Sequence, residues 1–340
     1  MSKCDLRIVL DREDGCYEIG ELVRGVVQVQ VNEPCKCKKL TLTQRWKTHG
    51  RGNRTAGPKD EDVLFAGTFE PGQHEYPFEF PAPAGPLSYH GHYLNVDWYL
   101  TARADIPWAI DPKAETELLV IRGDYDGAVD FGLGPDSPPE KLATGKASGG
   151  LIAVGCFGLV FALMGTAALV TMLMAPAGSR PPLPVMIIPC VFIAVGLGIM
   201  FFGIRNVLAE RKLGGVDVTL SNYHPAAGEA VTCTLTFRPK TTVKLNAISA
   251  CLKGEEVVVR GSGSNRSTYR HGIFEQRETM IERKQASVGR AITLETTFVL
   301  PEDAPPTFRA SDNSLVWQVS VAIDIPGWPD WSKDYAIFVS

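Results

Sequence analysis

Two long stretches without a charged residue are the feature that most limits which folds this chain can adopt. Residues 151–174 read LIAVGCFGLVFALMGTAALVTMLM and residues 185–204 read VMIIPCVFIAVGLGIMFFGI, with no Asp, Glu, Lys or Arg in either. A helix rises about 1.5 Å per residue, so about 20 apolar residues cross a hydrocarbon layer about 30 Å thick. We therefore predict transmembrane helices over 151–174 and 185–209. The alternative is a pair of buried core helices, which are normally shorter and keep a polar stripe.

The segment between these stretches predicts a hairpin. Residues 175–184 read APAGSRPPLP, whose prolines and glycine end one helix before the next begins. So short an extracytoplasmic turn places both chain ends on one side of the membrane. The basic residues that flank the hairpin are Lys141, Lys146, Arg205, Arg211 and Lys212, whereas the turn contains only Arg180. The positive-inside rule then predicts a two-pass protein with both termini cytoplasmic, and the charged start MSKCDLRIVL does not read as a signal peptide.

The cysteines and histidines do not indicate a cofactor. The chain has eight cysteines, two of them in the apolar stretches, and we expect free thiols in a reducing cytosol. Cys35 and Cys37 alternate along an expected strand, so their side chains should share one face. Neither this pair nor His90 and His92 comes with a complete ligand set at metal-site spacing. We therefore predict no metal and no other cofactor.

The sequences on either side of the hairpin repeat one pattern. The first copy opens with LRIVL at residues 6–10, and a Gly-Glu pair leads into VRGVVQVQV. The second opens with VDVTL at residues 216–220, and a Gly-Glu pair precedes VTCTLTF. Further along, the copies align at Pro81 with Pro301, Pro86 with Pro306, Trp98 with Trp317, and Asp105-Ile106-Pro107 with Asp324-Ile325-Pro326. The repeat is far longer than the 20 to 50 residues of a solenoid unit, so each copy should fold as a domain.

Within each copy the apolar residues alternate with polar ones. Runs such as VDWYLTARADI and VWQVSVAIDI have the period of two that is typical of strands buried on one face. Proline and glycine clusters separate these runs, which indicates antiparallel β-sandwiches over residues 1–122 and 213–340. Trp98 and Trp317 lie inside apolar strands and are expected to anchor the two cores.

The order of these motifs resembles the arrestin fold. A strand, then Tyr17 or Tyr223, a Gly-Glu pair before an alternating strand, and a proline-rich turn before W-x-[LV] and D-I-P are similar to arrestin-domain-containing proteins, the α-arrestins and their bacterial relatives. The resemblance implies an all-β soluble part with two arrestin-like antiparallel β-sandwich lobes, here combined with an α-helical transmembrane hairpin. It also implies an adaptor or scaffold without catalysis. The chain departs from the α-arrestins in lacking a PPxY motif.

In the arrestin layout a loop after the early strands of the first lobe contacts a receptor. The matching segment here is residues 49–62, HGRGNRTAGPKDED, and the second copy has a comparable loop, RGSGSNRSTYRHG. The resemblance implies partner-binding roles for their basic residues, which are Arg51, Arg54, Lys59, Arg260, Arg266 and Arg270. Such groups suit an acidic peptide, a phosphate or an anionic lipid headgroup. The alternative is that both loops are solvated hairpin tips.

The remaining segments predict connections rather than sites. Residues 123–150 are rich in glycine, proline and acidic residues, which favours an extended linker. Asn53-Arg54-Thr55 and Asn265-Arg266-Ser267 are N-x-[ST] triplets that would matter only if the lobes faced the cell exterior. The chain contains no P-loop, no G-x-S-x-G and no H-E-x-x-H motif, so we do not expect an enzyme.

These observations predict a membrane-anchored arrestin-like adaptor or scaffold. Its expected partners are the lipid bilayer, other membrane or cytosolic proteins, and anionic lipid headgroups, but no nucleic acid. One alternative is a structural or assembly subunit of a larger membrane complex. Another is a metal or thiol enzyme that uses Cys35 and Cys37, or His90 and His92.

Overall fold

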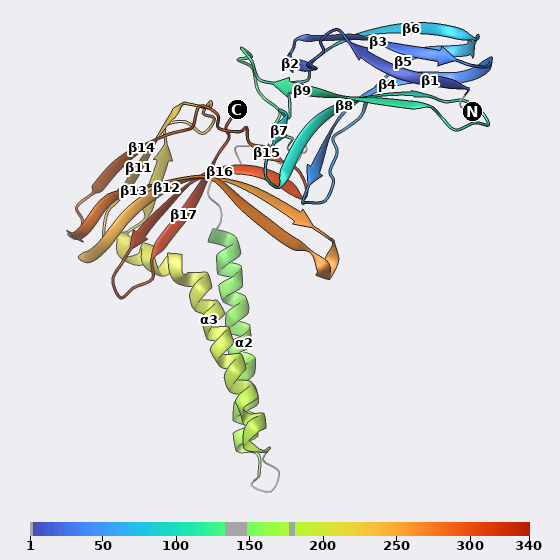
Figure 1. The fold of residues 1–340 in the computed structure, drawn as a ribbon. Coiled ribbons are helices and arrows are strands. Elements are labelled where there is room, and N and C mark those ends of the chain that lie inside the picture. Colours follow the sequence, from blue (N-terminus) through green and yellow to red (C-terminus); the bar gives the residue numbers. More distant parts are fainter. Residues whose placement is uncertain (1–2, 133–147, 177–180) are drawn as a thin grey trace.

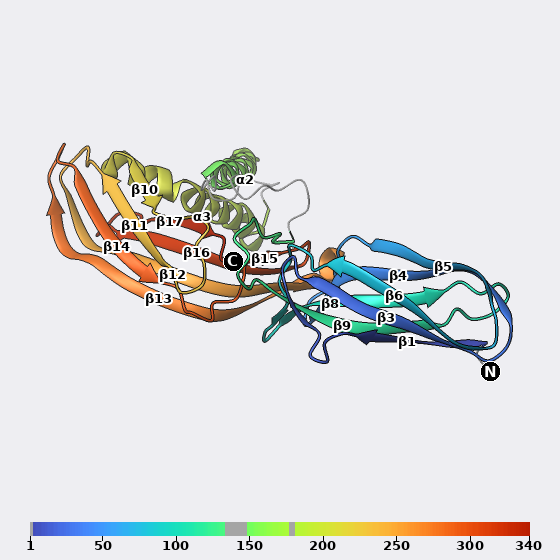
Figure 2. The ribbon, with the colours of Figure 1, turned by 90° about the horizontal axis from the view of Figure 1, so that it is seen from above.

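The computed structural model describes residues 3–132, 148–176 and 181–340. Two β lobes form an elongated body, and a pair of helices projects away from it beneath the second lobe (Figure 1). Seen from above, the N-terminus lies at the far end of the first lobe and the C-terminus lies where the two lobes meet (Figure 2). The predicted all-β lobes with a helical hairpin are therefore confirmed.

The first lobe is a sandwich of a three-stranded and a six-stranded sheet. The smaller sheet has the order β1-β3-β6, and the larger has the order β2-β9-β8-β4-β5 with β7 beside β8. All strand pairs are antiparallel except β2 with β9. The strands are β1 (Cys4–Leu10), β2 (Cys16–Glu18), β3 (Leu22–Val31), β4 (Cys35–Gly50), β5 (Asp60–Phe69), β6 (Gly72–Pro81), β7 (Tyr89–His90), β8 (Leu94–Ala104) and β9 (Lys113–Ile121).

The second lobe repeats this arrangement. Its smaller sheet has the order β10-β11-β14, and its five-stranded sheet has the order β13-β12-β16-β15 with β17 beside β16. The elements are β10 (Val216–Leu220), β11 (Ala230–Phe237), β12 (Val243–Arg260), the 3-10 helix η2 (Gly263–Asn265), β13 (Ser267–Ala286), β14 (Ile292–Val299), β15 (Phe308–Arg309), β16 (Asn313–Asp324) and β17 (Trp331–Ile337).

The two predicted tryptophan anchors occupy equivalent places. Trp98 and Trp317 are 7% and 1% exposed, which confirms them as core residues. Trp98 Nε1 donates to Pro86 O at 2.8 Å, and Trp317 Nε1 donates to Pro305 O at 2.9 Å. The counterpart of Pro86 is thus Pro305, and the predicted alignment with Pro306 is wrong by one residue. The sequence alone does not decide which proline aligns with Pro86, because both residues of the Pro305-Pro306 pair fit the pattern.

The Gly-Glu pairs also form the same turn in both lobes. Gly20 and Gly228 each have φ of +79°, a left-handed conformation that glycine adopts without a Cβ clash. Their amides donate to equivalent carbonyls, Gly20 N to Ala82 O and Gly228 N to Pro301 O, both at 3.0 Å. The counterpart of Pro301 in this turn is thus Ala82, and the predicted alignment of Pro301 with Pro81 is also wrong by one residue. The repeat that the sequence predicts is therefore present in the backbone hydrogen bonds as well as in the strand order.

The helices are α2 (Ser148–Met174) and α3 (Leu183–Leu213). The spans Val154–Met174 and Pro184–Phe202 are long and apolar enough to cross a membrane, yet only 17% and 11% of their most apolar windows are buried. Core helices of a soluble protein would be covered by other elements, so the alternative of buried core helices does not fit. Of the predicted turn 175–184, residues 177–180 lie outside the described part of the chain.

Glycines let the two helices touch through their backbones. A Cβ built on Gly196 would lie 2.5 Å from Ala162 N and 2.7 Å from Gly158 O. Small residues at a helix–helix contact let the two backbones approach closely, as is common between membrane-spanning helices. Gly198, two residues further along α3, has nothing within 4 Å of its Cβ position.

Replacing Gly196 with leucine should separate α2 from α3, whereas the same change at Gly198 should not. Overpacking at a tight backbone contact costs about 1–3 kcal/mol, and Gly198 has room for a side chain. The unfolding temperature of each variant can be measured by thermal unfolding in detergent. Equal unfolding temperatures for Gly196→Leu and Gly198→Leu would contradict this packing.

The C-terminal part of α3 extends beyond the predicted end at residue 209 and docks on the second lobe. Trp328 Nε1 donates to Leu208 O at 3.1 Å, and Lys212 Nζ lies 3.9 Å from the centroid of the Trp328 ring. Trp331 Nε1 donates to Glu210 Oε1 at 3.2 Å. These contacts accompany about one helical turn that hydropathy alone does not predict. They join the apolar helix directly to the lobe.

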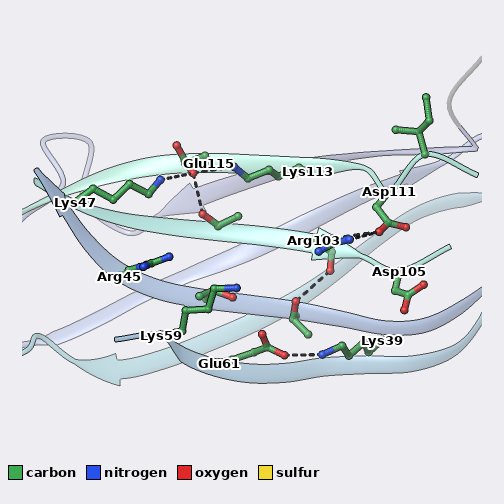
Figure 3. Close-up of a pocket in the computed structure, with 14 residues that line it drawn as sticks. Lys39, Arg45, Lys47, Lys59, Glu61, Arg103, Asp105, Asp111, Lys113 and Glu115 are labelled. Atoms are coloured by element: carbon green, nitrogen blue, oxygen red, sulfur yellow. Dashed lines mark hydrogen bonds and ion pairs between the residues drawn. The ribbon is translucent and has the colours of Figure 1, made fainter. Parts of the chain in front are cut away.

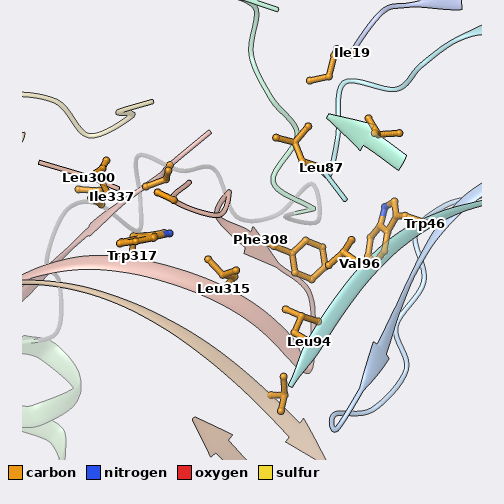
Figure 4. Close-up of a cluster of buried hydrophobic side chains, with 14 of the residues drawn as sticks. Ile19, Trp46, Leu87, Leu94, Val96, Leu300, Phe308, Leu315, Trp317 and Ile337 are labelled. Atoms are coloured by element: carbon orange, nitrogen blue, oxygen red, sulfur yellow. The ribbon is translucent and has the colours of Figure 1, made fainter. Parts of the chain in front are cut away.

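The hydrophobic core continues from one lobe to the other. At the junction the Trp46 ring of the first lobe meets the Phe308 ring of the second edge to face, with centroids 5.5 Å apart. Leu94, Val96 and Leu315 surround this contact and are fully buried (Figure 4). The two lobes therefore share an apolar interface.

Candidate interaction face and lobe interface

A polar hollow of about 610 Å³ lies on the open face of the six-stranded sheet (Figure 3). The inward side chains of β4 and β8 fill the sandwich core, so the alternate positions on these strands point into the hollow. Its charged residues are six basic, Lys39, Arg45, Lys47, Lys59, Arg103 and Lys113, and four acidic, Glu61, Asp105, Asp111 and Glu115. The hollow thus has an excess of basic groups.

Ion pairs on this face of the sheet hold most of these charges. Lys39 Nζ lies 2.7 Å from Glu61 Oε1. Lys47 and Lys113 both contact Glu115 Oε2, at 2.9 and 3.0 Å. Partly exposed pairs of this kind contribute at most about 1 kcal/mol each to stability. Their main effect is to fix where charge is presented on the sheet.

The pKa of Glu115 provides a test of this arrangement. Burial alone would raise it, but donation from Lys47, Lys113 and Thr101 outweighs burial and lowers the pKa to about 2. Because the folded-state value is depressed, the stabilisation is present above the unfolded value of 4.5 and is lost as pH falls through about 2. In a Lys47→Met variant, carboxyl NMR titration should show the Glu115 pKa moved up toward 4.5. An unchanged value would contradict the assigned contacts.

The two loops predicted to bind partners meet each other at the lobe interface. Asn53 N donates to Val259 O at 2.8 Å, and Asn53 Nδ2 donates to Gly261 O at 3.0 Å and to Asp312 Oδ2 at 2.9 Å. Asn313 Nδ2 in turn donates to Asn53 O at 2.6 Å. Residues 49–62 therefore contact the second lobe directly.

Three of the six predicted basic residues have partners within the chain. The Arg51 guanidinium lies 3.9 Å from the centroid of the Tyr269 ring, so it bridges the lobes by a cation–π contact. Arg266 lies 3.0 Å from Asp312, and Arg270 lies 3.0 Å from Glu255. The other three are exposed and form no ion pair or side-chain hydrogen bond within the described residues; they are Arg54, Lys59 and Arg260.

A buried carboxyl group joins the lobes beside these loops. Glu256 on β12 is 0% exposed and accepts hydrogen bonds from Tyr89 Oη at 2.6 Å, His92 N at 2.9 Å and Tyr93 N at 2.7 Å. Burial, reinforced by the bond to Glu256, raises the pKa of the Tyr89 hydroxyl well above its usual value. Sequence reasoning missed this residue. The available signal was a charged side chain at an inward position of the alternating run VKLNAISACLKGEEVVVR.

The start of the predicted linker 123–150 also lies at the interface. The Phe131 and Phe338 rings are 5.6 Å apart, and Arg309 N donates to Phe131 O at 2.9 Å. Residues 133–147 of that linker lie outside the described part of the chain. Phe131, an apolar residue in this glycine-rich acidic segment, therefore packs against the second lobe.

Of the predicted cysteine and histidine pairs, only the cysteines share one environment. Cys35 and Cys37 are both buried, which confirms that they point to the same face. Burial raises the pKa of the Cys37 thiol to about 11, so it packs as an apolar group. The His90 and His92 side chains diverge, since the His92 ring stacks on His271 at 4.3 Å.

Comparison with known proteins agrees with this architecture. Residues 60–124, which contain β5 to β9 and much of the hollow, match the family model for the arrestin (or S-antigen) N-terminal domain. The chain is 27% identical over 142 residues to arrestin domain-containing protein 4 of Homo sapiens and 26% identical over 141 residues to that of Mus musculus. Each alignment covers 33% of this chain, which spans about a third of the length of these relatives.

The matched segment and the paired sandwiches support an arrestin-like fold. In this chain a hairpin of two long apolar helices separates the two lobes in sequence.

Proposed function

We propose that this protein is a membrane-anchored, non-catalytic adaptor whose hairpin crosses the membrane twice, with both termini in the cytoplasm. The observation that carries the proposal is the course of α3, which continues from its apolar span into direct contact with the second lobe. The lobes would then be held at the membrane surface without a recruitment step. Tethering of this kind raises the effective concentration toward other membrane proteins to roughly millimolar values.

The environment of Asn53 supports a cytoplasmic location for the lobes. Its side-chain amide donates to Gly261 and Asp312 within the lobe interface. A glycan on that nitrogen would replace one of its two hydrogens, so at least one of these bonds would be lost and the sugar would force the lobes apart. The N-x-[ST] triplet at Asn53 is thus compatible with the folded interface only where glycosylation does not occur.

We infer that the partners are acidic or phosphorylated segments of other membrane or cytosolic proteins, with anionic lipid headgroups as a second source of negative charge. Arg54, Lys59 and Arg260 are exposed and have no ion-pair partner among the described residues, so they can bind an anion without breaking an ion pair or a side-chain hydrogen bond. Arg51, Arg266 and Arg270 would have to exchange the internal partners described above. Guanidinium groups favour planar, bidentate hydrogen bonding to a carboxylate or a phosphate.

Photocrosslinking in intact membranes tests this function. A photoreactive residue at position 59, or at the exposed position 60, should capture membrane-protein neighbours, and the label at position 60 should lose them in the triple variant Arg54→Glu, Lys59→Glu, Arg260→Glu. The same label at Gln73, on the opposite sheet, serves as the control. Capture of no protein at position 59, or of the same proteins at positions 59 and 73, would contradict the adaptor proposal. A single partner in fixed stoichiometry would instead favour a structural subunit.

A further inference from the structure

Four strands bring two imidazoles and two carboxyl groups together at one end of the open sheet face. His49 lies on β4, His90 on β7, Asp97 on β8 and Glu117 on β9. His49 and His90 are both in register with Asn95 of β8, one on each side of that strand. Strand pairing therefore fixes the backbone positions of these residues relative to one another.

The ligand atoms of three of these residues converge. Asp97 is only 1% exposed, and its Oδ1 lies 2.5 Å from His90 Nε2. Glu117 Oε1 lies 3.9 Å from the same nitrogen. All three ligand atoms lie within 4.8 Å of one another, the sole such group of histidine, cysteine or acidic side chains in the described ranges.

From this geometry we propose that His90, Asp97 and Glu117 bind a divalent transition-metal ion, with Zn²⁺ as the best match. Zinc bonds of about 2.0–2.2 Å place neighbouring ligand atoms about 3.5 Å apart, a value that lies between the 2.5 Å of the His90–Asp97 hydrogen bond and the 3.9 Å from His90 to Glu117. The His90 and Glu117 side chains are 56% and 52% exposed and can turn to complete the site. An imidazole ligand disfavours Ca²⁺ and Mg²⁺, which prefer oxygen.

His49 acts as the positioning residue for Asp97. Its Nε2 hydrogen-bonds Asp97 Oδ2, while its Nδ1 faces Asn95 Nδ2 at 3.4 Å. Metal-binding carboxylates are commonly oriented by an outer hydrogen bond of this kind. Three protein ligands would leave a fourth coordination position for water or for a carboxylate of a bound partner.

The bound ion would stabilise the interface between the lobes. His90 stands between Tyr89 and His92, both of which donate hydrogen bonds to the buried Glu256 of the second lobe. A metal that fixes His90 on the first lobe therefore also fixes the segment that contacts the second lobe. Because the ion binds the folded protein, it should raise the unfolding temperature as its concentration rises.

Titration of the metal-stripped full chain in detergent with ZnCl₂ tests the site. Calorimetry should show one Zn²⁺ per chain at this site, and Glu117→Gln and His90→Ala should each weaken binding at least tenfold. Glu115→Gln changes the same strand and the same face but not the site, so its affinity should equal that of the unmodified protein. Co²⁺ added in place of Zn²⁺ should give a visible absorption band that is lost in His90→Ala.

Two results would overturn the proposal. One is Zn²⁺ affinity that is unchanged in both Glu117→Gln and His90→Ala, because any ion bound would then sit elsewhere. The other is the absence of binding heat and of a Co²⁺ band in the unmodified protein. Glu117 is half exposed, so Glu117→Gln keeps the test valid even if His90→Ala fails to fold.

Discussion

Replacing Glu256 with alanine should destabilise the protein by about 3 kcal/mol and loosen the contact between the lobes. The carboxyl group is fully buried and receives three hydrogen bonds from the Tyr89–Tyr93 segment of the first lobe. Its removal leaves the Tyr89 hydroxyl and two backbone amides without acceptors. Buried donors that lose their acceptors cost far more than the bonds contribute when made.

The neighbouring glutamate provides the control for this experiment. Glu255 pairs with Arg270 at the surface, so Glu255→Ala should change stability by less than about 1 kcal/mol. Thermal unfolding measures the loss, and spin-label distances between the lobes measure the separation. A Glu256→Ala protein that matches Glu255→Ala in both would show that the lobes are not held by this carboxyl group.

Replacing Trp331 with alanine should cost about 4 kcal/mol and release α3 from the second lobe. The side chain is 1% exposed and its indole nitrogen donates to Glu210 of α3 at 3.2 Å. The substitution therefore creates a cavity in the core of the lobe and removes a contact that fixes the helix. Both effects act at the point where the anchor joins the β domain.

An exposed tryptophan of the first lobe supplies the control. Trp108 is fully exposed, so Trp108→Ala should change stability by no more than about 0.5 kcal/mol. Limited proteolysis between residues 205 and 214 should become faster in Trp331→Ala and stay unchanged in Trp108→Ala. Equal cleavage rates would mean that Trp331 does not hold the helix on the lobe.

Patterns that repeat over short distances predicted most of this fold. The apolar stretches predicted α2 and α3 because length and lack of charge are sufficient evidence for such helices. The alternation around Trp98 and Trp317 predicted the strands and the repeat because a half-buried strand has a period of two. The end of α3 was not predicted, since its last turns are held by Trp328 and Trp331, which follow more than 100 residues later.

The sites depend on pairing that no local pattern reports. The basic loops around Arg51 and Arg266 were found as charged hairpin tips, but nothing in either loop indicated that they meet. The sequence likewise grouped His90 with His92 because they are neighbours in the chain. The structure groups His90 with Asp97 and Glu117, which come from adjacent strands of one sheet. Strand register, which sets these neighbours, is decided by the whole sandwich.

Labelling of tags in intact cells tests the central claim most directly, namely that the hairpin crosses the membrane and leaves both lobes in the cytoplasm. We predict that epitopes fused at either end are labelled only after the membrane is permeabilised, whereas an epitope inserted between α2 and α3 is labelled in intact cells. Labelling of the terminal epitopes in intact cells, or release of the protein as a soluble species, would contradict the account.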